Sequence, residues 1–369
     1  MNLNKKTLKR FDFILIIDVI ILTIYGLIMI NSATSGNSFL SNPFVKTQLI
    51  AFILGLAAVT VLLFIDYEIY GNLYLIIYSI SNILLLAVLI FGFGEDQWGA
   101  RSWLSVGPIT FQPSEIAKIG IIISLSKFIE KNENTLNKPF TLLKILAFAG
   151  VPIILILMQP DFGTAMVMLF FIAIMLFISG IDYKYIISAV ILALGALPII
   201  YMNLKKFQID RIKVFFNPLL DPQGAGYQVL QSKIAIGSGK LFGRGLYKGV
   251  QNQYGFLPAK ETDFIFAVIG EELGLMGGGV LIFLYIILMY RLIKISKNSL
   301  DTFGSLMVIG FSGMMLFHIF ENIGMTIGLT PVTGIPLPFI SYGGTFMLVN
   351  MVCIGLSLNV GLKKEGLEF

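Results

Sequence analysis

The sequence contains a single cysteine, Cys353, and a single histidine, His318, and both lie in long apolar stretches. One cysteine excludes a disulfide within the chain and a zinc site built from cysteines, so we interpret Cys353 as a packing residue. One histidine without a second imidazole makes a poor metal site. Glu321 and Asn322 follow His318 within one helical turn. This spacing allows a proton relay or a polar clasp between helices, and we favour the clasp.

Charged residues are also scarce, at 13% of the chain, whereas 56% is hydrophobic and the mean hydropathy is +0.87. Soluble domains carry about 25% charged residues, so the composition predicts a polytopic membrane protein. Apolar runs long enough to cross about 30 Å of hydrocarbon recur along the chain, and we count about ten. Because the runs are continuous and do not alternate, we predict an all-α fold and one integral membrane domain, residues 1–369. The predicted spans are 11–30, 45–65, 73–93, 114–129, 142–158, 162–179, 185–202, 275–292, 306–323 and 346–360.

Basic residues are concentrated in alternate connections between these spans. The residues in question are Lys5, Lys6, Lys9, Arg10, Lys127, Lys131, Lys138, Lys144, Arg291, Lys294, Lys297, Lys363 and Lys364. With about ten spans they share one side, which the positive-inside rule assigns to the cytoplasm together with both termini. The first apolar run is too long for a cleaved signal, so we expect it to be the first span. We find no clear internal repeat, which argues against a transporter built from repeats.

One long segment, about 203–262, breaks this pattern, because the predicted topology places it outside the cell although it is basic. Its bases are Lys205, Lys206, Arg211, Lys213, Lys233, Lys240, Arg244, Lys248 and Lys260. Long loops are partly exempt from the positive-inside rule, so the topology stands and the charge predicts an anionic ligand or anionic headgroups. The glycine-rich run 236–245 fails the Walker spacing at Ile234 and Leu241. Its N–H groups, with Lys240 and Arg244, either approach a phosphate or form a plain surface turn.

Two aspartates lie at the ends of predicted spans. Asp263 is at the seam between the long polar segment and a strongly apolar stretch, where a charge is costly unless it is used or paired. We therefore take it as the first candidate for catalysis, with a helix N-cap by Thr262 or Asp263 as the alternative. For Asp161, which follows a Gln-Pro pair, we favour a cap on the sixth span.

The run Phe111–Lys118 has the pattern of a helix start at the fourth span, with Pro113 or Ser114 at its first turn. Glu115 and Lys118 are then one turn apart. They form either an ion pair at the helix entrance or part of a hydrated outer cavity, in which Lys118 and Arg101 meet a phosphate. The spacing does not decide between the two.

Six motifs, spread over most of the chain, carry a resemblance to a known family. They are Gly99–Leu104, Gln112–Lys118, Gln159–Thr164, Asp221–Tyr227, Thr262–Phe266 and Pro331–Gly344. The chain resembles the shape, elongation, division and sporulation (SEDS) family. The run Asp221–Tyr227 and the short termini make it more similar to the elongation branch than to the division branch.

The resemblance implies a peptidoglycan glycosyltransferase that polymerises lipid II at the outer face of the bacterial cytoplasmic membrane. Asp263 matches the essential aspartate of the family and is the expected general base. Arg101, Glu115, Lys118, Lys240, Arg244 and Lys260 are the expected substrate-binding residues. The resemblance also implies a class B penicillin-binding protein as transpeptidase partner, other membrane proteins of the elongation complex, and a glycan linked to undecaprenyl pyrophosphate.

Three other interpretations stay open at this point. A lipid II flippase is compatible with about ten spans and with buried acids such as Asp18 and Glu115. A division or sporulation paralogue would catalyse the same reaction, and a scaffold that activates its partner would catalyse none. We expect no cofactor and no metal cluster. A divalent cation, if one takes part, would bind with the substrate pyrophosphate.

Overall fold

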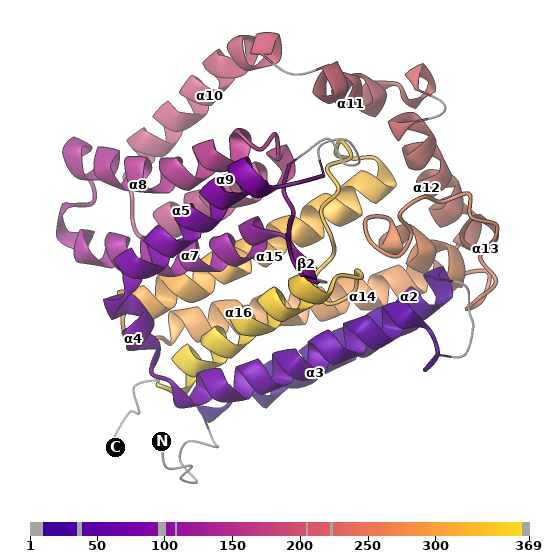
Figure 1. Cartoon of the computed structure of the whole chain (residues 1–369), viewed down its shortest axis with the longest axis horizontal. Helices are drawn as coiled ribbons and strands as arrows, with labels where there is room; N and C mark the ends of the chain where they lie inside the picture. Colours follow the sequence, from indigo (N-terminus) through magenta and orange to yellow (C-terminus); the bar gives the residue numbers. More distant parts are fainter. Residues whose placement is uncertain are drawn as a thin grey trace.

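All ten predicted spans are helices in the computed structural model, which describes residues 10–34, 39–94, 101–107, 109–203, 206–221 and 224–363 (Figure 1). They are α2 Phe13–Ala33, α3 Pro43–Phe64, α5 Tyr74–Phe91, α7 Pro113–Lys131, α8 Pro139–Leu157, α9 Phe162–Ile178, α10 Tyr183–Asn203, α14 Ile265–Lys297, α15 Thr302–Ile327 and α16 Gly344–Leu362. Within the described ranges, seven of them are long and apolar enough to cross a membrane. The predicted all-α class is confirmed. Lys5, Lys6, Lys9, Lys205, Lys364 and the motif residues 99–100 and 222–223 lie outside the described residues.

Shorter elements connect these helices. They are α4 Tyr67–Asn72, α11 Lys206–Phe216, α12 Ala225–Gly239, α13 Val250–Gln253, the 3₁₀ turns η1 Glu133–Thr135 and η2 Pro218–Leu220, and the strands β1 Leu104–Val106 and β2 Ile109–Phe111. The two strands form an antiparallel hairpin with Leu104 opposite Phe111. Proline occupies the first helical position of α3, α7 and α8, where its missing N–H costs nothing.

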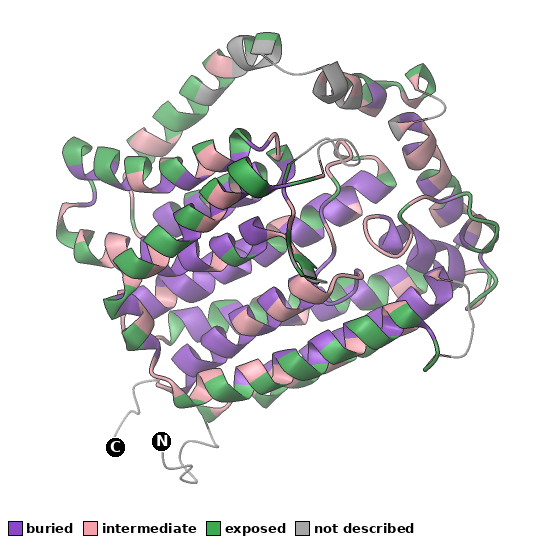
Figure 2. Cartoon of the chain, in the orientation of Figure 1, coloured by how far each residue is buried: buried purple, intermediate pink, exposed green. Residues whose placement is uncertain are grey.

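The two C-terminal helices form the centre of the bundle. α15 packs against α7, α9 and α14, and α16 packs against α3. Their apolar windows are 78% and 83% buried, against 22% to 28% for α3, α5 and α8. Figure 2 shows the same division, with buried residues along α15 and α16 and exposed residues along α3 and α8. The outer helices therefore present apolar faces to lipid, as expected for a polytopic membrane protein.

Two of the predicted cytoplasmic bases form ion pairs at one end of the bundle. The guanidinium of Arg291, near the end of α14, donates to both oxygens of Asp12, which caps the start of α2. Lys363, after α16, pairs with Asp66, after α3. The ends of α3, α14 and α16 and the start of α2 therefore share one end, and Asp263, before α14, lies toward the other.

The segment 203–262, predicted only as a large loop, is largely helical. It contains α11, α12 and α13, and α12 packs along α14 and α15. The eighth predicted span is part of a longer helix, because α14 begins at Ile265, ten residues before the predicted Leu275. Gly274 interrupts α14 with φ 66° and ψ −163°, so α14 consists of two helices joined at a kink, and the second begins at Leu275, the predicted start of the eighth span.

Candidate active site

Asp263 lies in the turn before α14, whose main-chain carbonyls accept hydrogen bonds from α15 and from the segment between α15 and α16. The amide of Asn322 donates to the Asp263 carbonyl over 2.9 Å and to the Ile335 carbonyl over 2.8 Å. The Ser341 hydroxyl donates to the Thr262 carbonyl over 2.6 Å, and the Tyr342 N–H donates to the Glu261 carbonyl over 2.9 Å. The turn is thus fixed at three successive residues. The N-cap alternative is wrong, because the N-cap residue of α14 is Phe264 and neither Thr262 nor Asp263 occupies that position.

The Asp263 carboxylate faces a glycine of the same segment. Gly334 has φ +75°, and a Cβ built on it would lie 3.4 Å from Oδ2 of Asp263. Asp263 is half-buried, so its carboxylate is neither sealed in the core nor fully in solvent. The carboxylate thus lies on a fixed turn, beside a residue without a side chain. In this position it can accept a proton from a bound hydroxyl.

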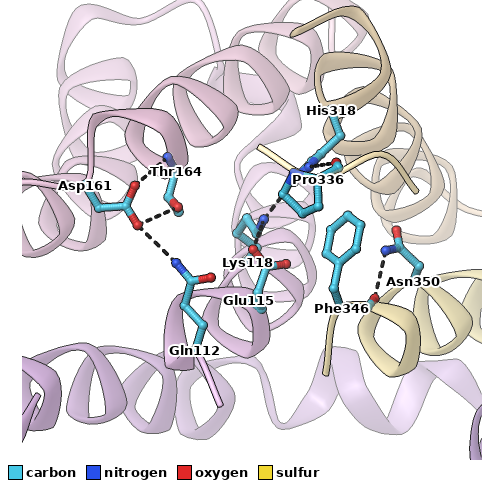
Figure 3. Close-up of polar contacts among 9 residues, drawn as sticks. All are labelled: Gln112, Glu115, Lys118, Asp161, Thr164, His318, Pro336, Phe346 and Asn350. Atoms are coloured by element: carbon cyan, nitrogen blue, oxygen red, sulfur yellow. Dashed lines mark hydrogen bonds and ion pairs between the residues drawn. The ribbon is translucent and has the colours of Figure 1, made fainter. Parts of the chain in front are cut away.

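A second polar cluster lies inside the bundle at the start of α7 (Figure 3). Nζ of Lys118 lies 2.8 Å from Oε1 of Glu115 and 3.0 Å from Nε2 of His318. Nδ1 of His318 lies 3.1 Å from the Pro336 carbonyl, so we assign its N–H to Nδ1 and the acceptor role to Nε2. The i,i+3 ion pair of Glu115 and Lys118, one of the two interpretations that the sequence left open, is present and buried, with Lys118 fully inaccessible.

The helix α15 joins the two clusters. His318 and Asn322 are one turn apart on it, and they bond to Pro336 and Ile335 of the same segment. Glu321 accepts a hydrogen bond from Thr333 over 3.0 Å. The three residues therefore join α15 to other elements of the bundle, as in the clasp favoured from sequence.

Asp161 also has its predicted role (Figure 3). It caps α9 by accepting from the N–H and the hydroxyl of Thr164, and it accepts from the Gln112 amide over 3.2 Å. Arg101 is exposed, and its guanidinium donates to the carbonyls of Gly92 and Leu89 at the end of α5. The structure thus brings Glu115 and Lys118 together, while Arg101 binds a different element.

The glycine-rich run 236–245 fills the break in α14. The N–H groups of Arg244 and Gly245 donate to the carbonyls of Glu271 and Glu272, over 3.0 and 2.9 Å. On the other side of Gly274, the N–H groups of Leu275 and Met276 donate to the carbonyls of Lys240 and Leu241. The N–H groups of Arg244 and Gly245 are therefore occupied by α14, whereas the side chains of Lys240 and Arg244 are exposed and could meet a phosphate.

Two buried glutamates, which the sequence analysis did not single out, hold this region to α2 and α13. Glu271 accepts from the N–H groups of Gln251 and Asn252, and Glu272 accepts from the Ser32 hydroxyl over 2.6 Å. Lys260 donates to the Asn252 carbonyl over 2.5 Å. Burial lowers the pKa of Lys260 below its usual value, and nearby carboxylates offset only part of this effect. The adjacent Glu-Glu pair before an apolar run was the signal in the sequence, since two buried acids need partners.

The fold and these clusters define a polytopic α-helical membrane protein with a carboxylate site at one end of the bundle. The family model for the FtsW/RodA/SpoVE cell cycle proteins matches residues 12–365. The chain is 36% identical over 374 residues to the peptidoglycan glycosyltransferase MrdB of Escherichia coli K12, covering 100% of this chain and 98% of that protein. The chain therefore belongs to the FtsW/RodA/SpoVE family, as its SEDS motifs predicted.

Solved structures agree with this assignment. A structure described as a peptidoglycan synthase complex that coordinates polymerization and crosslinking matches with a TM-score of 0.81 at 30% identity, covering 95% of this chain and 97% of that chain. The rod shape determining protein RodA of Thermus thermophilus matches with a TM-score of 0.72 at 27% identity, covering 96% and 98% of the two chains. The elongation-branch resemblance, which is that to RodA, is supported by both sequence and structure.

Proposed function

We propose that this chain polymerises lipid II into glycan strands at the outer face of the bacterial cytoplasmic membrane, with Asp263 as the general base. The chain is a peptidoglycan glycosyltransferase of the SEDS family, the activity for which its relative MrdB is named. The observation that carries the role of Asp263 is its position on a turn fixed at three successive residues, with its carboxylate beside Gly334.

The reaction joins two lipid-linked sugars. The 4-hydroxyl oxygen of the acceptor N-acetylglucosamine attacks the anomeric carbon of the donor N-acetylmuramic acid, and its proton passes to the Asp263 carboxylate. The bond from that carbon to the pyrophosphate oxygen breaks, and undecaprenyl pyrophosphate leaves with the electron pair. A base held in place before the substrate binds avoids the cost of ordering it in the transition state.

The leaving pyrophosphate carries negative charge, which basic side chains at the same end of the helix bundle as Asp263 can stabilise. We assign this role to Arg101 and Lys260, and we assign phosphate contacts in the same leaflet to Lys240 and Arg244. Arg101, Lys240 and Arg244 are exposed, and Lys260 is half-buried. In the described ranges no group of three or more His, Cys, Asp and Glu side chains could hold a metal ion, so a divalent cation would enter bound to the pyrophosphate.

Glu115 and Lys118 act from behind this surface. Their pair is buried, and Lys118 reaches His318, which holds the Pro336 carbonyl of the segment that contains Gly334. We propose that the pair contributes to substrate binding in two ways, through its electrostatic field and by holding this segment in place. The buried position makes both effects stronger than they would be in water.

The proposed orientation places both termini and the basic end in the cytoplasm. Asp263, toward the other end, then faces the compartment in which glycan strands grow. A class B penicillin-binding protein is the proposed partner, in keeping with the synthase complex to which this chain is similar. Other membrane proteins of an elongation complex are proposed from the family alone.

The test is polymerisation of purified lipid II with the partner present and its transpeptidase blocked by penicillin. Asp263→Asn should lower the rate by about 10²- to 10⁴-fold, the usual contribution of a general base. Glu261→Gln is the matched control, because this neighbouring carboxylate lies on the same turn and its main chain, not its side chain, bonds Tyr342. The thermal midpoints of the three proteins should agree.

Other outcomes would count against the proposal in different ways. Equal polymer from the native chain and Asp263→Asn would remove Asp263 from catalysis while leaving the enzyme assignment intact. Polymer from none of the proteins, in samples that are folded and bind the partner, would favour the flippase or the scaffold. A flippase would then move fluorescent lipid II across a vesicle membrane in the absence of polymerisation.

A further inference from the structure

An apolar turn, residues 240–248, lies beside the first turn of α14 after the break at Gly274. Leu241 and Phe242 are 57% and 75% exposed, and Leu275 and Met276 are 68% and 61% exposed. The two pairs belong to one surface, because the N–H groups of Leu275 and Met276 donate to the carbonyls of Lys240 and Leu241, over 2.9 and 3.0 Å. The turn therefore lies beside the predicted start of the eighth span.

The turn is held from several sides, so its exposed side chains do not simply reflect a loose loop. The N–H groups of Arg244 and Gly245 bond α14, and the N–H of Tyr247 donates to Oε2 of Glu272 over 3.1 Å. The hydroxyl of Tyr247 accepts from the Asn31 amide of α2 over 3.0 Å. The exposure of Leu241 and Phe242 therefore belongs to a turn whose main chain is hydrogen-bonded to α14.

Basic side chains surround these apolar groups. Lys240, Arg244 and Lys248 are exposed, and the sequence from 239 to 256 contains no Asp or Glu. The nearest acids of α14, Glu271 and Glu272, are fully buried and bonded to Gln251, Asn252 and Ser32. The surface is thus positive around an apolar centre, the combination that binds an anionic membrane interface.

We propose that the turn 240–248 is a membrane-interface anchor. Leu241 and Phe242 enter the leaflet beside Leu275 and Met276, while Lys240, Arg244 and Lys248 bind the phosphate headgroups of bulk anionic phospholipids. In the proposed orientation this is the outer leaflet. The anchor fixes the height of Asp263 relative to the bilayer, because the turn and Asp263 flank the same first third of α14. This inference does not rest on the proposed glycosyltransferase activity.

The test measures the depth of residue 242 with brominated lipids. The full chain has two tryptophans, which are replaced by phenylalanine before Phe242→Trp is introduced. In vesicles, bromine near the headgroup end of the acyl chain should quench this tryptophan more than bromine near its terminus. Phe283→Trp is the matched control, since Phe283 is also exposed. It lies eight residues beyond Leu275 along α14, which places it about 12 Å deeper than the turn. Its preference for bromine depth should be reversed.

A second arm tests the headgroups. Brominated phosphatidylglycerol should quench Trp at 242 more than brominated phosphatidylcholine at the same mole fraction. Each base near an anionic surface contributes up to about fivefold in association. Replacing Lys240, Arg244 and Lys248 by glutamine, or adding high salt, should remove the difference. The samples contain no lipid-linked pyrophosphate, so the signal comes from bulk lipid alone.

Two results would overturn the inference. If acrylamide in the water quenches Trp at 242 and brominated lipid does not, the turn faces solvent or a partner protein. If the two lipids quench equally, both in the protein that keeps Lys240, Arg244 and Lys248 and in the glutamine variant, the turn does not recognise anionic headgroups. Leu241→Trp repeats the measurement at the neighbouring exposed position if the first variant fails to fold. Neither result bears on polymerisation, which is assayed separately.

Discussion

The side-chain amide of Asn322 bridges the main-chain carbonyls of Asp263 and Ile335, over 2.9 and 2.8 Å. Asn322 is fully buried on α15, so this bridge ties the proposed catalytic turn to the centre of the bundle. Together with the bonds from Ser341 and Tyr342, it fixes the turn of Asp263 to the segment that contains Gly334. The bridge makes Asn322 a positioning residue, because the contact involves the main chain of Asp263 and not its carboxylate.

Loss of this bridge should reduce catalysis more than binding. Asn322→Ala leaves both carbonyls without their donor and lets the turn shift, and a misplacement of about 1 Å can lower a rate by about 100-fold. We expect kcat for glycan polymerisation to fall and KM to change little. Asn82→Ala is the control, because Asn82 is also a buried amide but bonds Tyr78 of its own helix. An equal loss of kcat in both variants would contradict the positioning role.

The sequence predicted the ten long helices because a span leaves a continuous apolar run, which is a local property. It also predicted the Asp161 cap, and it offered the ion pair of Glu115 with Lys118 as one of two alternatives. It did not predict the break at Gly274 or its cause. That break is stabilised by the turn around Lys240, more than thirty residues earlier, and no local pattern encodes such a contact.

In the candidate site, too, the sequence did not predict contacts between distant parts of the chain. Asp263 was found because a lone carboxylate at a membrane seam is unusual. The residues that hold its turn, Asn322 and Ser341, come from distant parts of the sequence, and their hydroxyl and amide groups have many ordinary roles in membrane helices. Glu271 and Glu272 were visible as a pair, but their partners on α2 and α13 were not.

A paired substitution separates the structural and functional roles of Glu115 and Lys118. Lys118→Met leaves the Glu115 charge buried without its cation and should lower the free energy of unfolding by about 3–5 kcal/mol. Adding Glu115→Met removes that charge, and the double variant should regain most of the stability. If the pair contributes to substrate binding, the double variant stays defective in polymerisation. A stable double variant with the native rate would remove both residues from the proposed site.

The helix α12 leads into the turn that fills the break in α14. It should tolerate alanine at one of its last glycines and be destabilised by alanine at the other. A Cβ on Gly239 would overlap the Gly270 carbonyl, whereas a Cβ on Gly237, in the same helix α12, meets nothing within 4 Å. Gly239→Ala should therefore lower the free energy of unfolding by about 1–3 kcal/mol. Gly237→Ala should raise it by up to about 1 kcal/mol, through helix propensity. Thermal unfolding in detergent measures both, and equal midpoints would mean that the close contact at Gly239 relaxes without cost.

Asp18 should be replaceable with a gain in stability. It is 3% exposed on α2, and among the described residues neither of its carboxyl oxygens has a hydrogen-bond partner. A buried polar group without partners costs about 1–3 kcal/mol, so Asp18→Leu should raise the thermal midpoint. Ser32→Ala, on the same helix, should lower the midpoint, because it removes a donor from the buried Glu272. If Asp18→Leu instead destabilises the protein or stops polymerisation, the carboxyl group must gain a partner in another state of the enzyme, such as one with lipid II bound.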